Sequence, residues 1–94
     1  MKTIYKYELK ITDTQAIALP MGATILHLDV QNNKPCIWAL IPAGAGVHAP
    51  KERRFHTYGT GHQIPDLKLK YVGSYQASGN IMHFVGHVFE EIIL

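Results

Sequence analysis

Short runs in which apolar and polar residues alternate constrain this chain more than any other feature. The first is "IYKYELKI", residues 4–11, where lysines and a glutamate separate the apolar side chains. A β-strand turns successive side chains to opposite faces, so this alternation predicts a strand with one face toward the core and one toward solvent. The side toward the core would carry Tyr5, Tyr7, Leu9 and Ile11. No run shows the 3.6-residue period of an amphipathic helix, beyond a single turn at residues 13–17.

Further strand-like runs follow between turn residues, and they are "QAIALP", "ATILHLDV", "CIWALIP", "RRFHTYG", "LKLKYVGSYQ" and "IMHFVGHVFEEIIL". In the second of these, Leu26, Leu28 and Val30 would share one face. "CIWALIP" is apolar on both faces, which is typical of a central strand. Asn32-Asn33 suits the left-handed backbone of a tight hairpin turn, and "ASGN" predicts another hairpin turn. "AGAGVHAPKE" has no period and predicts an exposed loop.

These runs predict one all-β domain covering residues 1–94. The predicted architecture is a small sandwich or a partly open barrel of about seven mainly antiparallel strands. A chain of 94 residues is too short for two domains with separate cores. It also buries only a modest share of its surface, so a partner would add to its stability.

The balance of charge argues against a nucleic-acid partner. The net charge is only +2, and the nine lysines and arginines are spread along the chain from Lys2 to Lys70. Nucleic-acid binders usually gather their basic residues on one face. A weak nucleic-acid binder that uses Lys51, Arg53, Arg54 and Lys70 stays open as a lesser alternative.

Cysteine usage and hydropathy indicate a soluble cytoplasmic protein. Cys36 is the one cysteine, so no disulfide can form within the chain, and a reducing compartment fits. Its place in an apolar run predicts a buried, inert thiol. The longest apolar stretch, Cys36 to Pro42, is too short to cross a membrane as a helix. The charges at residues 2, 6, 8 and 10 leave no room in the first ten residues for the apolar core of a secretory signal.

The segment "RRFHTYGTGHQIPD", residues 53–66, is the strongest candidate for a site. Its candidate ligand- or partner-binding residues are Arg53, Arg54, His56, Tyr58, Thr60, Gly61 and His62. One interpretation is a strand that runs into a turn, with Gly59 and Gly61 at positive φ. The alternative is a ligand contact in which Gly61 lets backbone N–H groups approach an anion, while His62 and an arginine add donors. A nucleotide phosphate loop is excluded because no helix pattern follows the glycines.

Metal and covalent chemistry find little support in the sequence. His83 and His87 share a strand face but lie about 13 Å apart at the strand rise, so a regular strand cannot bring both to one ion. The serines lack an elbow motif and the carboxylates are scattered, so we predict no catalytic residue, no metal and no cofactor. An enzyme with a site at a subunit interface around Arg53, Arg54 and His62 is kept as the alternative.

The aromatic residues divide into two groups. We expect core positions for Trp38, Phe55, Phe84 and Phe89 because each falls within a predicted strand. Tyr58, Tyr71 and Tyr75 fit either the core, with a solvated hydroxyl, or a surface on which a base or a partner stacks.

Five motifs follow one another along nearly the whole chain: "YKYEL", "LPMGATIL", "QNNKPCIWAL", "GTGHQIPD" and the closing "HVFE". In their order and spacing they resemble a family of small proteins from bacteriophages, prophages and bacteria. That family is described as a domain of unknown function, so the resemblance implies no activity and no catalytic residues. It implies a phage or mobile-element setting and hence the host cytoplasm.

The sequence therefore favours a small, non-catalytic binding module that engages a host protein or a small anionic ligand, with counter-defence as one use. We also expect a homodimer. The first and last strands could each lie at a sheet edge, and the segment Ile92 to Leu94 has no charged residue to guard it. Pairing about a two-fold axis would cover such an edge, which places the C-terminal segment in or near the predicted interface.

Overall fold

The computed structural model describes residues 1–44, 49–78 and 83–93, and for His83 the backbone alone. The described residues form seven strands and no helix, as the alternation predicts. In chain order these strands are β1 (Thr3–Glu8), β2 (Thr14–Leu19), β3 (Thr24–Gln31), β4 (Lys34–Ile41), β5 (Lys51–Gly59), β6 (Leu69–Ser78) and β7 (His83–Glu91). His48, the tip of the "ASGN" turn and Leu94 lie outside the described residues.

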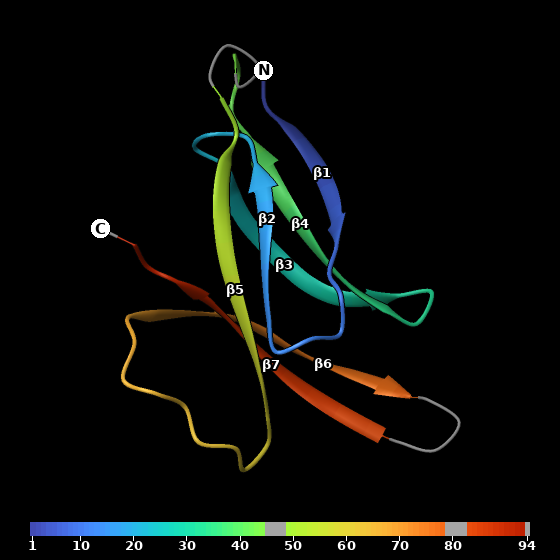
Figure 1. Ribbon diagram of the computed structural model, residues 1–94. Helices are drawn as coiled ribbons and strands as arrows, with labels where there is room; N and C mark the ends of the chain where they lie inside the picture. The colour runs from blue at the N-terminus through green and yellow to red at the C-terminus, as the bar shows by residue number, and fades with distance from the viewer. Residues whose placement is uncertain (45–48, 79–82, 94) are drawn as a thin grey trace.

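The strands build an open sandwich of two antiparallel sheets (Figure 1). The smaller sheet has the order β1-β4-β3 and the larger has the order β2-β5-β7-β6. Neither sheet closes on itself, so the sandwich and not the barrel is the correct alternative. β4 is the central strand of its sheet, as its apolar sequence predicts. β7 lies between β5 and β6, so the prediction that the last strand forms a sheet edge is wrong.

The long strand β5 connects the two ends of the larger sheet. Its first part, Lys51–His56, pairs with β2, whereas its last part, Phe55–Gly59, pairs with β7. β6 and β7 therefore cross the lower end of β5 in Figure 1 and do not run along its whole length. The residues of β5 before Phe55 have no backbone pairing with β7.

The core lies between the sheets and draws residues from both. Its buried members are Leu9, Leu19, Ala23, Leu28, Ile37, Ala39, Ile41, Phe55, Tyr75 and Val88. Fully burying one aliphatic or aromatic side chain contributes roughly 1.5–3 kcal/mol. Phe55 is the largest fully buried side chain among the described residues, as predicted for this strand. Phe84 packs against the core from a partly buried position.

Several side chains do not face the way that the sequence predicts, and Tyr5, 54% exposed on β1, is one of them. The pairing of β3 with β4 shifts between Ile25 and His27, so the bulge turns Leu26 outward and leaves Ile25 against the core. Trp38 is half-buried on the outer side of β4, where its ring lies 6.1 Å from the ring of His27. Ile11 follows the end of β1 and is exposed in the connection to β2.

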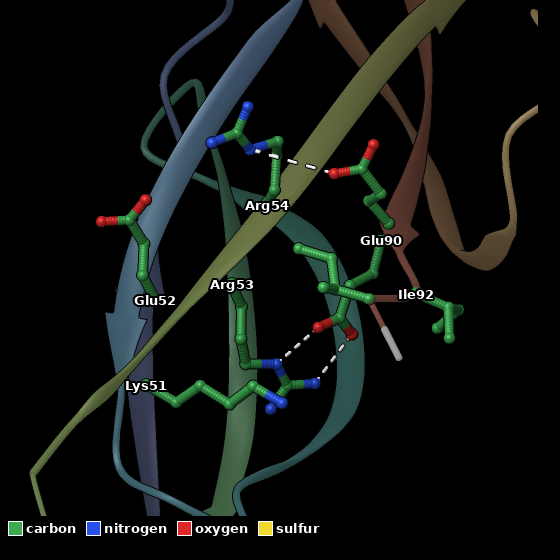
Figure 2. A pocket seen from close by; sticks show the side chains of 8 residues that line it. Lys51, Glu52, Arg53, Arg54, Glu90 and Ile92 are labelled. Carbon is green, nitrogen blue, oxygen red and sulfur yellow. Dashed lines mark hydrogen bonds and ion pairs between the residues drawn. The ribbon is translucent and has the colours of Figure 1, made fainter.

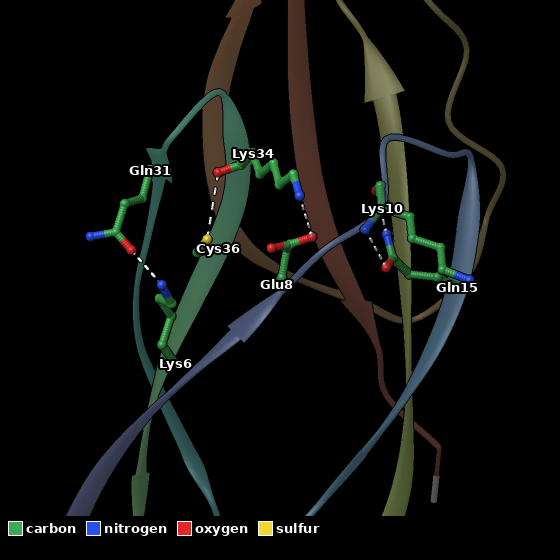
Figure 3. Close-up of polar contacts among 7 residues, drawn as sticks. All are labelled: Lys6, Glu8, Lys10, Gln15, Gln31, Lys34 and Cys36. Atoms are coloured by element: carbon green, nitrogen blue, oxygen red, sulfur yellow. Dashed lines mark hydrogen bonds and ion pairs between the residues drawn. The ribbon is translucent and has the colours of Figure 1, made fainter.

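The thiol of Cys36 is buried, as predicted, but on the outer side of β4. Two polar pairs lie on either side of it (Figure 3). Lys6 on β1 donates to the side chain of Gln31 on β3, and Lys34 lies 3.5 Å from the carboxylate of Glu8. The aliphatic stems of such lysines cover apolar surface while their charged ends stay in water.

The turn between β3 and β4 has the predicted geometry. Asn32 and Asn33 have φ of 53° and 65°, and Gln31 pairs with Lys34 across the turn. Two left-handed residues in a two-residue loop match the twist of the flanking strands. The described residues contain no helix that could span a membrane.

Candidate functional site

Alternation along β5 divides the predicted site between two faces of the larger sheet. Arg53 and Phe55 point toward the core, whereas Arg54, His56 and Tyr58 point away from it. Figure 2 shows Arg53 and Arg54 on opposite sides of the β5 ribbon. We call the side of β2-β5-β7-β6 that is turned away from the smaller sheet the outer face.

The guanidinium of Arg53 is fully engaged within the protein. It donates to both carboxylate oxygens of Glu90 at 2.5 and 2.7 Å, and to the backbone carbonyl of Ala23 at 2.6 Å. The adjoining hollow of about 130 Å³ is lined by Lys51, Glu52, Arg53, Arg54, Glu90, Glu91, Ile92 and Ile93. Its three basic residues face three carboxylates, so it offers an anion no surplus of positive charge.

The "GTGH" turn closes on itself. The backbone N–H of His62 donates to the carbonyl of Gly59, and the N–H of Gly59 donates to Nδ1 of His62 at 3.2 Å. Gly61 has the predicted positive φ, at 88°, but Gly59 does not. A Cβ at Gly59 would lie 2.9 Å from the exposed His62 ring, so a larger residue there would displace that ring.

The turn is also remote from the arginines. Gly59 follows Arg53 by six residues of strand, which corresponds to roughly 20 Å. The structure therefore does not bring His62 to Arg53 or Arg54 within one chain. An anion site that combines them would need a second chain.

Four rings gather on the outer face, and we call them the aromatic cluster: His56, Tyr58, Tyr71 and Phe89. Phe89 of β7 stands at its centre and meets Tyr58 and Tyr71 edge-on at 5.9 and 5.4 Å. His56 stacks on Tyr58 at 6.3 Å. The sequence predicts Phe89 in the core, and this prediction is wrong because Phe89 packs on the outer face. Tyr71 is 57% exposed, so this end of the cluster is open to a partner.

A chain of hydrogen bonds runs beside the cluster. The hydroxyl of Tyr71 lies 2.6 Å from Ser74 Oγ, which lies 2.7 Å from His87 Nδ1, and His87 Nε2 lies 2.8 Å from Thr60 Oγ1. A neutral imidazole satisfies this chain by accepting at one nitrogen and donating at the other. The chain fixes the side chains of β6, β7 and the end of β5 relative to one another.

Residues 1–93 match the family model described as a domain of unknown function (DUF7352). The chain belongs to the DUF7352 family. No curated protein and no solved structure matches it.

Ser74 and His87 of this DUF7352 domain lie within hydrogen-bond distance, but the contacts around them differ from those of a serine hydrolase. In such enzymes a carboxylate orients the histidine, and backbone N–H groups hold the developing oxyanion. In the part of the chain that the structure describes, the second nitrogen of His87 meets the hydroxyl of Thr60 and no carboxylate hydrogen-bonds to it. Nor do the described residues include a group of three or more that could hold a metal ion.

Charged residues border the aromatic cluster on its β2 side. Glu91 Oε1 lies 3.6 Å from His56 Nε2, and Glu91 Oε2 lies 4.0 Å from the guanidinium of Arg54. The other nitrogen of His56 lies 3.2 Å from the hydroxyl of Thr14. These contacts place one arginine and one carboxylate side by side, so this border of the DUF7352 domain has no net basic charge.

The structure brings part of the predicted set of residues together on one face. Arg54, His56, Tyr58 and Thr60 share the outer face, whereas Arg53, Gly61 and His62 do not contribute to it. Ser74, His87 and Phe89 were missed. His87 and Phe89 are two residues apart and share one face of β7, but only the pairing of β7 with both β5 and β6 joins them and Ser74 to the cluster.

Proposed function

We propose that this DUF7352 domain is a non-catalytic binding module that engages a protein partner through the outer face of its larger sheet. The observation that carries the proposal is the aromatic cluster, held in place by side-chain contacts on a face that no described element covers. Tyrosine and phenylalanine are enriched at protein interfaces, where a large rigid ring loses little entropy on binding.

The charges of this face favour a protein over the other expected ligands. A small anion would need free basic donors, but Arg53 is bonded to Glu90 and Arg54 stands beside Glu91. A nucleic acid would need a basic groove beside its stacking rings. A neutral aromatic patch with a polar rim meets neither need and is typical of a protein interface.

The resemblance to small phage and prophage proteins extends the proposal to the setting. A partner in the host cytoplasm, including a component of host defence, fits a small module that acts by binding and blocking. The phage or mobile-element origin is part of the proposal.

Capture from a bacterial lysate tests the binding face when two matched variants are compared. Tyr71→Ala removes an exposed ring of the aromatic cluster, and Tyr5→Ala removes a ring of nearly equal exposure, 57% against 54%, from β1 of the other sheet. An interface anchor contributes about 2 kcal/mol or more, so Tyr71→Ala should weaken capture at least tenfold. Tyr5→Ala should capture the same partner as the unaltered chain.

Equal capture by both variants would place the binding face elsewhere. Saturable retention of a small molecule and no protein would contradict the choice of partner. Turnover of a captured molecule that stops in Ser74→Ala would contradict the non-catalytic assignment.

A further inference from the structure

β2 presents a free row of backbone hydrogen-bonding groups at one edge of the larger sheet. Thr57 N–H donates to the carbonyl of Asp13, and Thr14 pairs with His56. In an antiparallel pair, residues alternate between bonding to the neighbour and pointing away from it. The N–H and C=O groups of Thr14, Ala16 and Ala18 therefore point away from β5, and no backbone group of the described residues bonds to them.

β2 also lacks the features that protect the other edge strands of the described sheets. β1 carries Lys6 and Glu8, β3 has its bulge at Leu26, and β6 has a register shift between Tyr71 and Gly73. Charges and bulges of this kind keep a sheet edge from pairing with another chain. β2, with the sequence "TQAIAL", has no charge, no proline and no register shift.

We propose that β2 pairs antiparallel with β2 of a second copy of this chain, about a two-fold axis that passes at Ile17. In this register Ile17 lies opposite Ile17 of the partner subunit, and Ala16 lies opposite the partner's Ala18. The outward-pointing groups of Ala16 and Ala18 then exchange backbone hydrogen bonds with the same residues of the partner. A two-fold axis repeats every contact, so each copy of β2 supplies hydrogen-bond partners for the outward-pointing groups of the other.

The side chains of β5 select this register. On the outer face Ala16 lies beside Arg54, and Ala18 lies beside Glu52. Figure 2 shows Glu52 and Arg54 on the same side of β5, over β2. Pairing centred on Ile17 lines up one residue from each of four adjacent strands in a row. The row runs from Arg54 through Ala16 and the partner's Ala18 to the partner's Glu52. Three strand spacings, about 14 Å between Cα atoms, separate the two residues, and their side chains together can span the small methyl groups.

Other registers lose this match. Pairing centred on Ala16 would set Arg54 in one row with the partner's Arg54, and pairing centred on Ala18 would set two copies of Glu52 in one row. Glu52 has no ion-pair partner among the residues that the structure describes, so it is available to the second copy. The two larger sheets would join into one continuous sheet, with both aromatic clusters on the same side.

This proposal does not depend on the proposed function, and charge exchange tests it directly. Light scattering at micromolar concentration should give twice the monomer mass for the unaltered chain. Glu52→Arg alone sets arginine against arginine, and Arg54→Glu alone sets glutamate against glutamate, so each variant should have the monomer mass. An equimolar mixture of the two variants restores both opposite-charge rows and should recover the dimer mass.

Ala16→Pro is the second variant. It removes an N–H that points away from β5, so it leaves the ladder within one chain intact while removing hydrogen bonds to the partner. Circular dichroism should remain that of the unaltered chain, and the mass should fall to that of a monomer. A monomer mass for the unaltered chain overturns the proposal. So does a folded Ala16→Pro variant that stays dimeric, or a mixture of the charge variants that stays monomeric.

Discussion

Arg53 and Glu90 form a two-pronged ion pair between β5 and β7 at the point where the backbone pairing of these strands ends. The side chains are only 17% and 11% exposed. Arg53 also reaches the carbonyl of Ala23, in the connection between β2 and β3. The pair therefore ties the end of the β5–β7 pairing to the connection between β2 and β3.

Arg53→Met should lower the free energy of unfolding by about 3–5 kcal/mol, because it leaves the Glu90 carboxylate shielded from water without a partner. Arg54→Met is the matched control. Its side chain is half exposed and lies 4.0 Å from Glu91, and exposed pairs of this kind contribute about 0–1 kcal/mol. Urea denaturation followed by circular dichroism measures both. Equal losses in the two variants would show that the Arg53–Glu90 pair has no special role.

Gly86→Ala should destabilise the larger sheet through overpacking. Tyr75 lies opposite Gly86 across the β6–β7 pair, and a Cβ at Gly86 would lie 2.8 Å from the Tyr75 ring and 3.0 Å from the Phe84 ring. Because Tyr75 is buried and cannot move aside, we expect a loss of about 1–3 kcal/mol. Gly59→Ala is the control, since the ring that it meets belongs to the exposed His62 and can swing away. A loss in Gly59→Ala as large as that in Gly86→Ala would contradict this reading of the packing.

The strands were predictable because alternation is a local property of the chain. The same holds for the turn at Asn32-Asn33, where the residue types themselves supply the left-handed backbone. The face that each strand turns to the core was less predictable. A single bulge reverses the alternation at Leu26, and an apolar strand such as β4 does not show which of its two faces meets the other sheet.

The candidate site was predictable only within one strand. Alternation alone puts Arg54, His56 and Tyr58 on one face and Arg53 on the other. The neighbours of these residues come from β7 and β6, which follow later in the sequence, and no local pattern encodes that pairing. The prediction of an arginine beside His62 failed because a strand of nine residues is rigid and holds its two ends apart.

Phe55→Ala should be more damaging than Trp38→Ala, although tryptophan is the larger residue. Phe55 is 1% exposed and lies in the core, so its truncation should cost about 3–5 kcal/mol. Trp38 packs on the outer side of β4 against His27, and we expect a loss of roughly 1–2 kcal/mol there. Denaturation midpoints in urea compare the two directly. A Trp38→Ala variant that unfolds more easily than Phe55→Ala would show that the outer side of β4 is covered, for example by a partner.

Tyr75→Phe should stabilise the protein and reduce its sensitivity to alkali. The Tyr75 hydroxyl is buried and has no hydrogen-bond partner among the described residues, so its removal should add about 1 kcal/mol at neutral pH. Burial also raises the pKa of Tyr75 above its ordinary value of 10.0. The folded state therefore keeps the phenol neutral while the unfolded chain ionises it. The contribution of Tyr75 to stability is constant well below pH 10 and falls as the pH rises above 10.

The pKa of Tyr7 is raised as well, by burial and by the neighbouring Tyr5, so Tyr75→Phe should reduce the alkaline loss and not abolish it. Tyr71→Phe is the matched control. Its hydroxyl lies 2.6 Å from Ser74 Oγ on an exposed side chain, so its removal should bring no gain at neutral pH. Thermal melts between neutral pH and pH 11 measure both effects, pH 11 being about one unit above the ordinary tyrosine pKa. A Tyr75→Phe variant that melts earlier at neutral pH would mean that the hydroxyl has a partner, because only the loss of a bonded group destabilises the folded state in this way.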